Sequence, residues 1–196
     1  RQEIINPEIL HAFHTGFKWS AMQRFWLDAE GFYQLHRNFQ TTARDSLSVD
    51  FRSKDAGQAT SYGIEVSARA ALFRHLDLYG NYAWIRAGFD TYDSDGDIQE
   101  YAGNTFRLTP EHSFQLGLIG KVKVHHNLDA FFVPSYAWKS HFWFHDSNLP
   151  GLEQPAFGLL SVRAGLNYKK PALTIALTGS NMMNEKFLIE EGKTTA

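Results

Sequence analysis

The chain has 196 residues, of which 43% are hydrophobic and 15% aromatic, so it can build an extensive apolar surface and is not a disordered tail. Its 19 Lys and Arg residues against 21 Asp and Glu residues give a net charge of −2, which argues against the basic surface of a nucleic-acid-binding protein. It has no cysteine and no apolar run long enough for a transmembrane helix, which excludes disulfide scaffolds, thiolate zinc sites and helical membrane spans.

Apolar and polar residues alternate along the chain with a period of two, which predicts strands with one apolar face. In segment 62–72, for example, the even positions are mostly apolar and the odd positions are small or charged. The eight predicted strands are 10–19, 25–36, 62–72, 76–86, 114–124, 128–138, 158–168 and 172–179. We therefore expect an all-β protein with about eight antiparallel meander strands.

The polar register of these strands carries many charged and amide side chains. Its members are Asp28, Glu30, Gln34, Glu65, Arg69, Asp77, Asn81, Gln115, Lys121, Lys123, Arg163 and Asn167. Buried charges without partners are costly, so this face should meet water or a polar domain and not a filled apolar core.

The connections between the predicted strands alternate between tight and long. The tight ones are 20–23, 73–75, 125–127 and 169–171, and the long polar ones are 37–59, 88–110 and 140–155. This alternation is typical of an outer-membrane β-barrel, which has short periplasmic turns and long extracellular loops. The sequence thus predicts an outer-membrane barrel that crosses the membrane with strands.

Aromatic residues on the apolar register fall near the predicted strand ends. Eight of them, Trp19, Phe25, Tyr33, Tyr62, Trp84, Tyr136, Trp138 and Tyr168, would form the aromatic girdles at the two membrane interfaces. The alternative is that they form the core of a soluble β-sandwich or a lipocalin-like barrel. Strands of this length joined by such long loops argue against a sandwich.

No motif in the sequence indicates catalysis or a bound metal. In the acidic segment 90–97, EF-hand spacing places Thr91 and Ala102 at two required ligand positions, which they cannot fill. His141 and His145 lack the glutamate of a zinc peptidase motif, and they lie where a strand passes into a loop. No nucleophile elbow, P-loop or dinucleotide fingerprint occurs. We therefore expect no enzyme activity and no cofactor.

Five stretches resemble TonB-dependent receptors, in the order expected for that family. One of them, DAGQATSYGIEVSAR at 55–69, is similar to a small-residue loop followed by a strand that begins Gly-(Val/Ile)-Glu, carried here by Gly57, Gly63 and Glu65, with Asp55 where Asn is commoner. The others are NPEILHAFHTGFKWS, LDLYGNYAW, YAGNTFRLTPEHSFQLGL, and PSYAWKSHFWFHDSN followed by FGLLSVRAGL and LTGSNMMNEKFL. Together they cover essentially the whole chain.

The resemblance implies a C-terminal portion of a wide barrel, of about 22 strands in such transporters, filled by a separate plug domain. It implies that 1–196 is one partial barrel domain cut at both ends, with the plug domain, TonB and the last strand outside it. Eight strands that keep the curvature of a wide barrel cannot close, so we expect an open curved sheet that forms part of the wall of a large transmembrane β-barrel.

The family resemblance further implies an outer-membrane location and energy-coupled uptake of a scarce solute, most often a ferric siderophore. The long-loop residues expected to contact the solute are Arg44, Arg52, Tyr92, Tyr101 and His145. Glu65, Arg69 and Arg163 are expected to line the path or touch the plug. Two alternatives remain: a self-contained eight-stranded ligand-binding barrel, in which the first and last strands would pair, and a passive porin.

Overall fold

The computed structural model describes residues 7–44, 51–55, 57–92, 96 and 98–189. Eight long strands form one sheet, whose members are β1 (Ile9–Ala21), β2 (Phe25–Arg37), β5 (Ala59–Phe73), β6 (Leu76–Phe89), β7 (His112–His125), β8 (Leu128–Lys139), β11 (Phe157–Tyr168) and β12 (Leu173–Gly179). Two small hairpins lie in the loops: β3 (Gln40–Arg44) with β4 (Phe51–Asp55), and β9 (Phe142–Trp143) with β10 (Glu153–Gln154).

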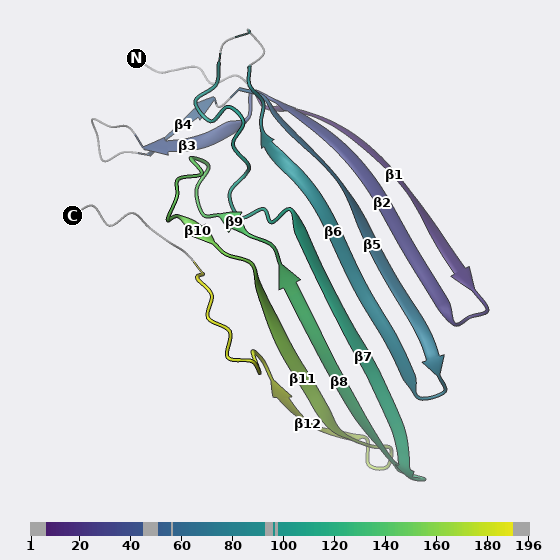
Figure 1. The fold of residues 1–196 in the computed structure, drawn as a ribbon. Coiled ribbons are helices and arrows are strands. Elements are labelled where there is room, and N and C mark those ends of the chain that lie inside the picture. The colour runs from purple at the N-terminus through teal and green to yellow at the C-terminus, as the bar shows by residue number, and fades with distance from the viewer. Residues whose placement is uncertain (1–6, 45–50, 56, 93–95, 97, 190–196) are drawn as a thin grey trace.

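The sheet is an open antiparallel meander. Its order is β1-β2-β5-β6-β7-β8-β11-β12, so β1 and β12 are opposite edges, and no contact joins these two strands. Figure 1 shows the strands side by side in one curved layer. The predicted open curved sheet is confirmed, and the arrangement does not fit a self-contained barrel closed between its first and last strands.

All eight predicted strands are confirmed, and most continue further toward the long loops than the alternation indicated. The tight turns are also confirmed. In the first of them, Met22 and Gln23 have positive φ values of 52° and 54°, and the Arg24 N–H donates to the Ala21 carbonyl at 3.0 Å. Two successive left-handed residues suit the twist of a hairpin, although neither residue is the Gly or Asn that usually signals such a turn.

The strand register places alternate residues on two different faces. One continuous row of cross-strand neighbours is Phe17, Ala29, Val66, Tyr82, Phe114 and Trp138, and the row beside it on the other face is Lys18, Asp28, Ser67, Asn81, Gln115 and Ala137. A one-residue slip between any two strands would mix these two sets of residues. The sets stay separate, so the registers of neighbouring strands agree across the sheet. We call the first the outer face and the second the inner face.

Aromatic rings lie over glycines on the inner face. Phe32 is the cross-strand neighbour of Gly63, and Phe131 that of Gly165. A Cβ atom built on Gly165 would lie 2.7 Å from the Phe131 ring and 2.2 Å from the Ile175 carbonyl oxygen. These positions therefore need glycine, because the ring and the neighbouring backbone occupy the space of a side chain.

Among the described residues, no helix is long and apolar enough to cross a membrane.

Candidate functional site

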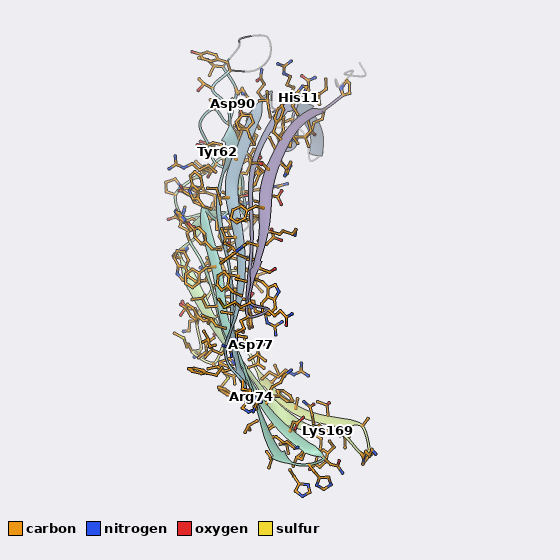
Figure 2. The ribbon with its side chains drawn as sticks, turned by 90° about the vertical axis from the view of Figure 1, so that its right-hand side faces the viewer. His11, Tyr62, Arg74, Asp77, Asp90 and Lys169 are labelled. Atoms are coloured by element: carbon orange, nitrogen blue, oxygen red, sulfur yellow. The ribbon has the colours of Figure 1, made fainter. Side chains whose placement is uncertain are left out.

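Two parts of the sheet carry the polar chemistry: the inner face and the end with the long loops. Figure 2 shows the curved sheet from the side, with His11, Tyr62 and Asp90 at the long-loop end and Arg74, Asp77 and Lys169 at the tight-turn end. The tight turns and the long loops thus lie at opposite ends of the strands.

Two glutamates face each other on the inner face, near the middle of the length of β2 and β5. Glu30 on β2 and Glu65 on β5 are direct cross-strand neighbours. His14 on β1 bonds to Glu30, with its Nδ1 2.7 Å from Oε1. No ion pair reaches Glu65 from any described residue. Like charges directly opposite each other on a sheet are destabilising, so this pair favours a cation between or above the two carboxylates.

Other inner-face charges are already matched within the sheet. Lys18 bonds to Asp28, and Arg69 Nη2 lies 2.5 Å from Asp77 Oδ2. The same Arg69 guanidinium lies 5.8 Å from the centre of the Trp26 ring. These pairs are largely exposed, so each one orients its side chains more than it stabilises the fold.

Arg163 lies in a different setting on β11. Its guanidinium is 5.6 Å from the centre of the Phe131 ring, and its side chain is exposed. A guanidinium above an aromatic face keeps its hydrogen-bond donors free for another group. Of the three residues predicted to line the path, Glu65, Arg69 and Arg163, all lie on the inner face, but they do not form one cluster.

At the long-loop end, Gln99 fastens the loop between β6 and β7 to the strand ends. Its side-chain amide accepts from the Gln58 N–H at 3.1 Å and donates to the carbonyls of Gln58, Asp90 and Tyr92 at 2.8–3.0 Å. The residue is only 9% exposed. One buried side chain therefore bonds backbone groups of residue 58, just before β5, and of residues 90 and 92, just after β6.

A second amide joins the β6–β7 loop to the β8–β11 loop. The Asn148 side chain accepts from the Thr105 N–H at 2.8 Å and donates to the Thr105 carbonyl at 3.0 Å. Close by, Asn104 donates to the Asp146 carbonyl at 2.8 Å. The two loops are thus held against each other, although their bonded residues lie about 43 positions apart in the sequence.

An aromatic cluster lies beneath these loops. Phe39, Phe89, Tyr101 and Phe106 pack with ring centroids 5.0–5.8 Å apart. Phe39 follows β2, whereas Phe89 ends β6, so the cluster ties the β2–β5 connection to the β6–β7 loop. Phe89 is 4% exposed, which makes this cluster a small hydrophobic core at the loop end.

The five residues predicted to contact a solute all belong to the long-loop end but to three separate loops. Arg44 and Arg52 lie on the β3–β4 hairpin, one position apart in its register. Tyr92 is exposed beside a bridge to Ile98, whereas the Tyr101 ring packs against Phe89. His145 lies in the β8–β11 loop, where its carbonyl accepts from Asn148. Solute contact by these residues stays a prediction.

The eight predicted girdle aromatics all share the outer face, as the register shows. At the loop end, Trp84 packs edge-on against Tyr62 and donates from Nε1 to Glu111 Oε1 at 3.1 Å. Arg86 Nε also donates to Glu111, at 2.8 Å. A ring that is apolar on one side and hydrogen-bonded at its polar edge suits a membrane interface, but lipid contact stays a prediction.

Glu111 precedes β7 on the loop side of the strand. The hydrogen bonds from Arg86 and then Trp84 hold the pKa of its carboxyl below the ordinary value, because both favour the charged form. No pattern in the sequence predicts a role for Glu111, Gln99 or Asn148. Each acts through a partner far away in the sequence, which leaves no local pattern.

The acidic segment 90–97 lies mainly outside the described residues. Its Asp93, Asp95 and Asp97 belong to the part that the structure does not describe. Asp90 accepts from the Thr60 hydroxyl at 3.0 Å. Among the described residues, no three His, Asp or Glu side chains are grouped so that they could hold a metal ion.

A family model described as "TonB dependent receptor-like, beta-barrel" matches residues 3–182. A comparison with curated protein sequences gives no match.

Several solved structures share the fold at low sequence identity. The ferric yersiniabactin uptake receptor of Yersinia pestis has a TM-score of 0.74 and 17% identity, over 92% of this chain and 26% of the receptor. The ferric preacinetobactin receptor of Acinetobacter baumannii has a TM-score of 0.70 and 18% identity, over 91% and 26%. A copper transporter has a TM-score of 0.71 and 12% identity, over 95% and 27%. The chain therefore spans about a quarter of the length of these structures.

Proposed function

Because the chain belongs to the family of TonB-dependent receptor β-barrels, we propose that it forms part of the wall of a larger barrel that imports a scarce solute, a ferric siderophore. Barrels of this family lie in the outer membrane of Gram-negative bacteria, and this chain is an outer-membrane protein of that kind. The family and its solved relatives are receptors and transporters and not enzymes.

One observation carries the proposal: the sheet is open, apolar on one face and charged on the other. Unpaired backbone groups at an open edge are very costly in lipid, so β1 and β12 need further strands beside them in a membrane. The charged inner face then belongs to a lumen wide enough for a plug domain. Uptake is coupled to TonB through that plug, which lies outside residues 1–196.

The inner face supplies contacts to the plug. Glu30 and Glu65 form a double negative charge that a lysine or arginine of the plug neutralises. Arg69 is largely engaged by Asp77 and Trp26, whereas Arg163 retains donors for a carboxylate of the plug or of the solute. Glu65, Arg69 and Arg163 therefore line the path, with Glu65 as the strongest plug contact.

The solute is recognised at the long-loop end. A ferric siderophore is bulky and in many cases anionic, so arginines and aromatic rings are suitable contacts. The contact residues are Arg44, Arg52, Tyr92, Tyr101 and His145. Tyr101 has a second role here, because its ring packs on Phe89 and orders the loop that carries Tyr92.

The outer face sits in lipid, with the aromatic girdles at its two borders. Trp19, Phe25 and Tyr168 mark the border near the tight turns, and Tyr33, Tyr62, Trp84, Tyr136 and Trp138 mark the border near the loops. Exposed apolar side chains between the girdles, such as Phe132 at 53% exposure, then face acyl chains.

Uptake of iron-loaded siderophores by cells tests the function. A strain without the full-length receptor should lose uptake of one labelled ferric siderophore, and the gene in trans should restore it. Removal of TonB in the complemented strain should abolish uptake again. Uptake that persists without TonB would instead favour a passive porin, and unchanged uptake of every siderophore in the receptor-deficient strain would contradict the proposed solute class.

A further inference from the structure

Every ionisable side chain in the four tight turns, including the adjoining His125, is a base. These seven residues, which we call the basic rim, are Arg24, Arg74, His75, His125, His126, Lys169 and Lys170, and all are exposed. Figure 2 shows Arg74 and Lys169 at the same end of the sheet. The turn residues 22–24, 74–75, 125–127 and 169–172 include no Asp or Glu, so no carboxylate within the turns balances the charge of the rim.

The carboxylates nearest to the rim are already engaged. Asp77 bonds to Arg69 at 2.5 Å, and Asp129 bonds to Lys169 at 3.0 Å. In the part of the chain that the structure describes, no ion pair reaches Arg24, Arg74 or Lys170. The rim therefore keeps three permanent charges, together with imidazole donors, available for a ligand outside the sheet.

Exposed apolar side chains adjoin the rim at each turn. Met22 is 92% exposed and Phe73 68%, and they lie within two residues of Arg24 and Arg74. Val124 and Leu173 are 58% and 49% exposed beside the other two turns. Apolar surface bordered by cations is the arrangement that binds a membrane surface with anionic headgroups.

The opposite end of the sheet differs in charge. The three long connections, 37–59, 88–110 and 140–155, together contain ten carboxylates and five lysines or arginines, and four of these five cations belong to 37–59. The loop end is therefore acidic as a whole, so a broad anionic surface would be drawn to the tight-turn end, whereas a small anionic solute can still bind the arginines of 37–59.

We propose that the basic rim binds the phosphate headgroups of anionic phospholipids in the leaflet at the tight-turn end. The inference rests on the proposed function, because it takes the outer face as the lipid-facing side. Arg24, Arg74 and Lys170 supply the charge, and Met22 and Phe73 enter the acyl region beside them. The lipids then hold the barrel at a fixed depth.

The test uses the full-length receptor in mixed vesicles of phosphatidylglycerol and phosphatidylcholine. Lipids retained by the receptor after gentle detergent extraction are measured by native mass spectrometry for the wild type and for the triple variant Arg24→Gln, Arg74→Gln, Lys170→Gln. Each cation near an anionic surface contributes roughly a fivefold preference, so the triple variant should lose phosphatidylglycerol selectivity by up to about a hundredfold. High salt should reduce the selectivity of the wild type.

A matched variant removes three cations elsewhere: Arg37→Gln, Lys139→Gln, Lys186→Gln. It should keep the wild-type lipid selectivity, because these residues lie away from the tight turns. Equal loss in both variants would overturn the proposal by showing a non-specific charge effect. Unchanged lipid selectivity in the rim variant would overturn the proposal as well. The same holds if the rim variant keeps its lipid selectivity but no longer binds an acidic protein, because the rim would then be a protein-binding surface.

Siderophore binding is measured on the same samples. The rim variant should bind the ferric siderophore like the wild type, because none of its three residues belongs to the solute-binding loops. Lost lipid selectivity together with normal siderophore binding supports the proposal that the basic rim binds anionic lipids. Normal lipid selectivity in a receptor that binds no siderophore would leave the rim in place and remove the proposed function.

Discussion

The two faces of the sheet come from the same strands but differ in how their side chains find partners. On the outer face, large apolar residues are exposed from one edge strand to the other, from Phe13 on β1 at 69% to Leu177 on β12 at 82%. On the inner face, charged residues meet named partners, such as Arg69 with Asp77. The outer face thus needs only a uniform apolar solvent, whereas the inner face needs particular groups at particular positions.

The largest expected effect comes from placing a charge on the outer face. Phe132→Lys should destabilise the barrel by about 2–4 kcal/mol, because Phe132 is exposed on the outer face midway between the girdle residues Tyr136 and Tyr168, where a lysine loses its hydration. The free energy of unfolding is measured by denaturant titration of the receptor in lipid vesicles.

The inner face provides the control for that substitution. Gln115→Lys places the same charge on the inner face of the adjacent strand β7, where it should change stability by less than about 1 kcal/mol. Equal losses from the two substitutions would mean that the two faces do not meet different surroundings.

The next effect concerns the close contacts of inner-face glycines. A Cβ atom on Gly63 would lie 2.3 Å from the Trp84 carbonyl oxygen and 3.0 Å from the Phe32 ring. Gly63→Ala should therefore cost about 1–3 kcal/mol through displaced backbone. Gly31 on the outer face has nothing nearer than 3.9 Å, so Gly31→Ala should be neutral or slightly stabilising in the same unfolding experiment. A harmless Gly63→Ala would contradict the described packing.

The sign of a smaller effect tests whether the inner face has a partner. In the sheet alone, Glu65→Gln relieves the repulsion from Glu30 and should stabilise by roughly 0.2–1 kcal/mol. With a plug cation in place, the same substitution should weaken the plug contact and destabilise the receptor. We expect destabilisation in the full-length receptor and stabilisation when the plug is removed, measured by unfolding of both forms. Stabilisation in both forms would argue against a plug cation at this position.

The smallest expected effect depends on pH. The pKa of Glu111 in the folded state is lowered by Arg86, so its stabilising contribution is present above the ordinary glutamate value of 4.5 and is lost as the pH falls through the lowered value. Wild type and Glu111→Gln should therefore differ in unfolding midpoint at neutral pH and converge in acid. Because both groups are exposed, the difference should be small, and a difference that grows in acid would contradict the assignment.

The strands and their faces could be predicted because each depends on neighbours in the sequence. Alternation of apolar and polar residues defines both the strand and its two sides, so the sequence alone predicts that Glu65 and Arg69 share the inner face. The β3–β4 hairpin was missed for the same reason. Its strands, QTTAR and FRSKD, are mostly polar on both sides and show no alternation.

Contacts between distant residues could not be predicted in this way. The opposition of Glu30 and Glu65 depends on the register of two strands joined by a long connection, which the sequence does not specify locally. The bonds of Asn148 to Thr105 depend on how two loops meet. The predicted solute contacts were chosen by residue type, so they fall on the correct end of the sheet but on separate loops.

The alternation of tight turns and long loops also has a kinetic consequence. Closing a tight turn costs little chain entropy, and β1–β2, β5–β6, β7–β8 and β11–β12 are each joined by one. The seams between these hairpins, such as β2 with β5, must close over the long connections and are expected to form later. The wall should therefore assemble from four preformed hairpins, with each seam completing the two faces of its neighbours.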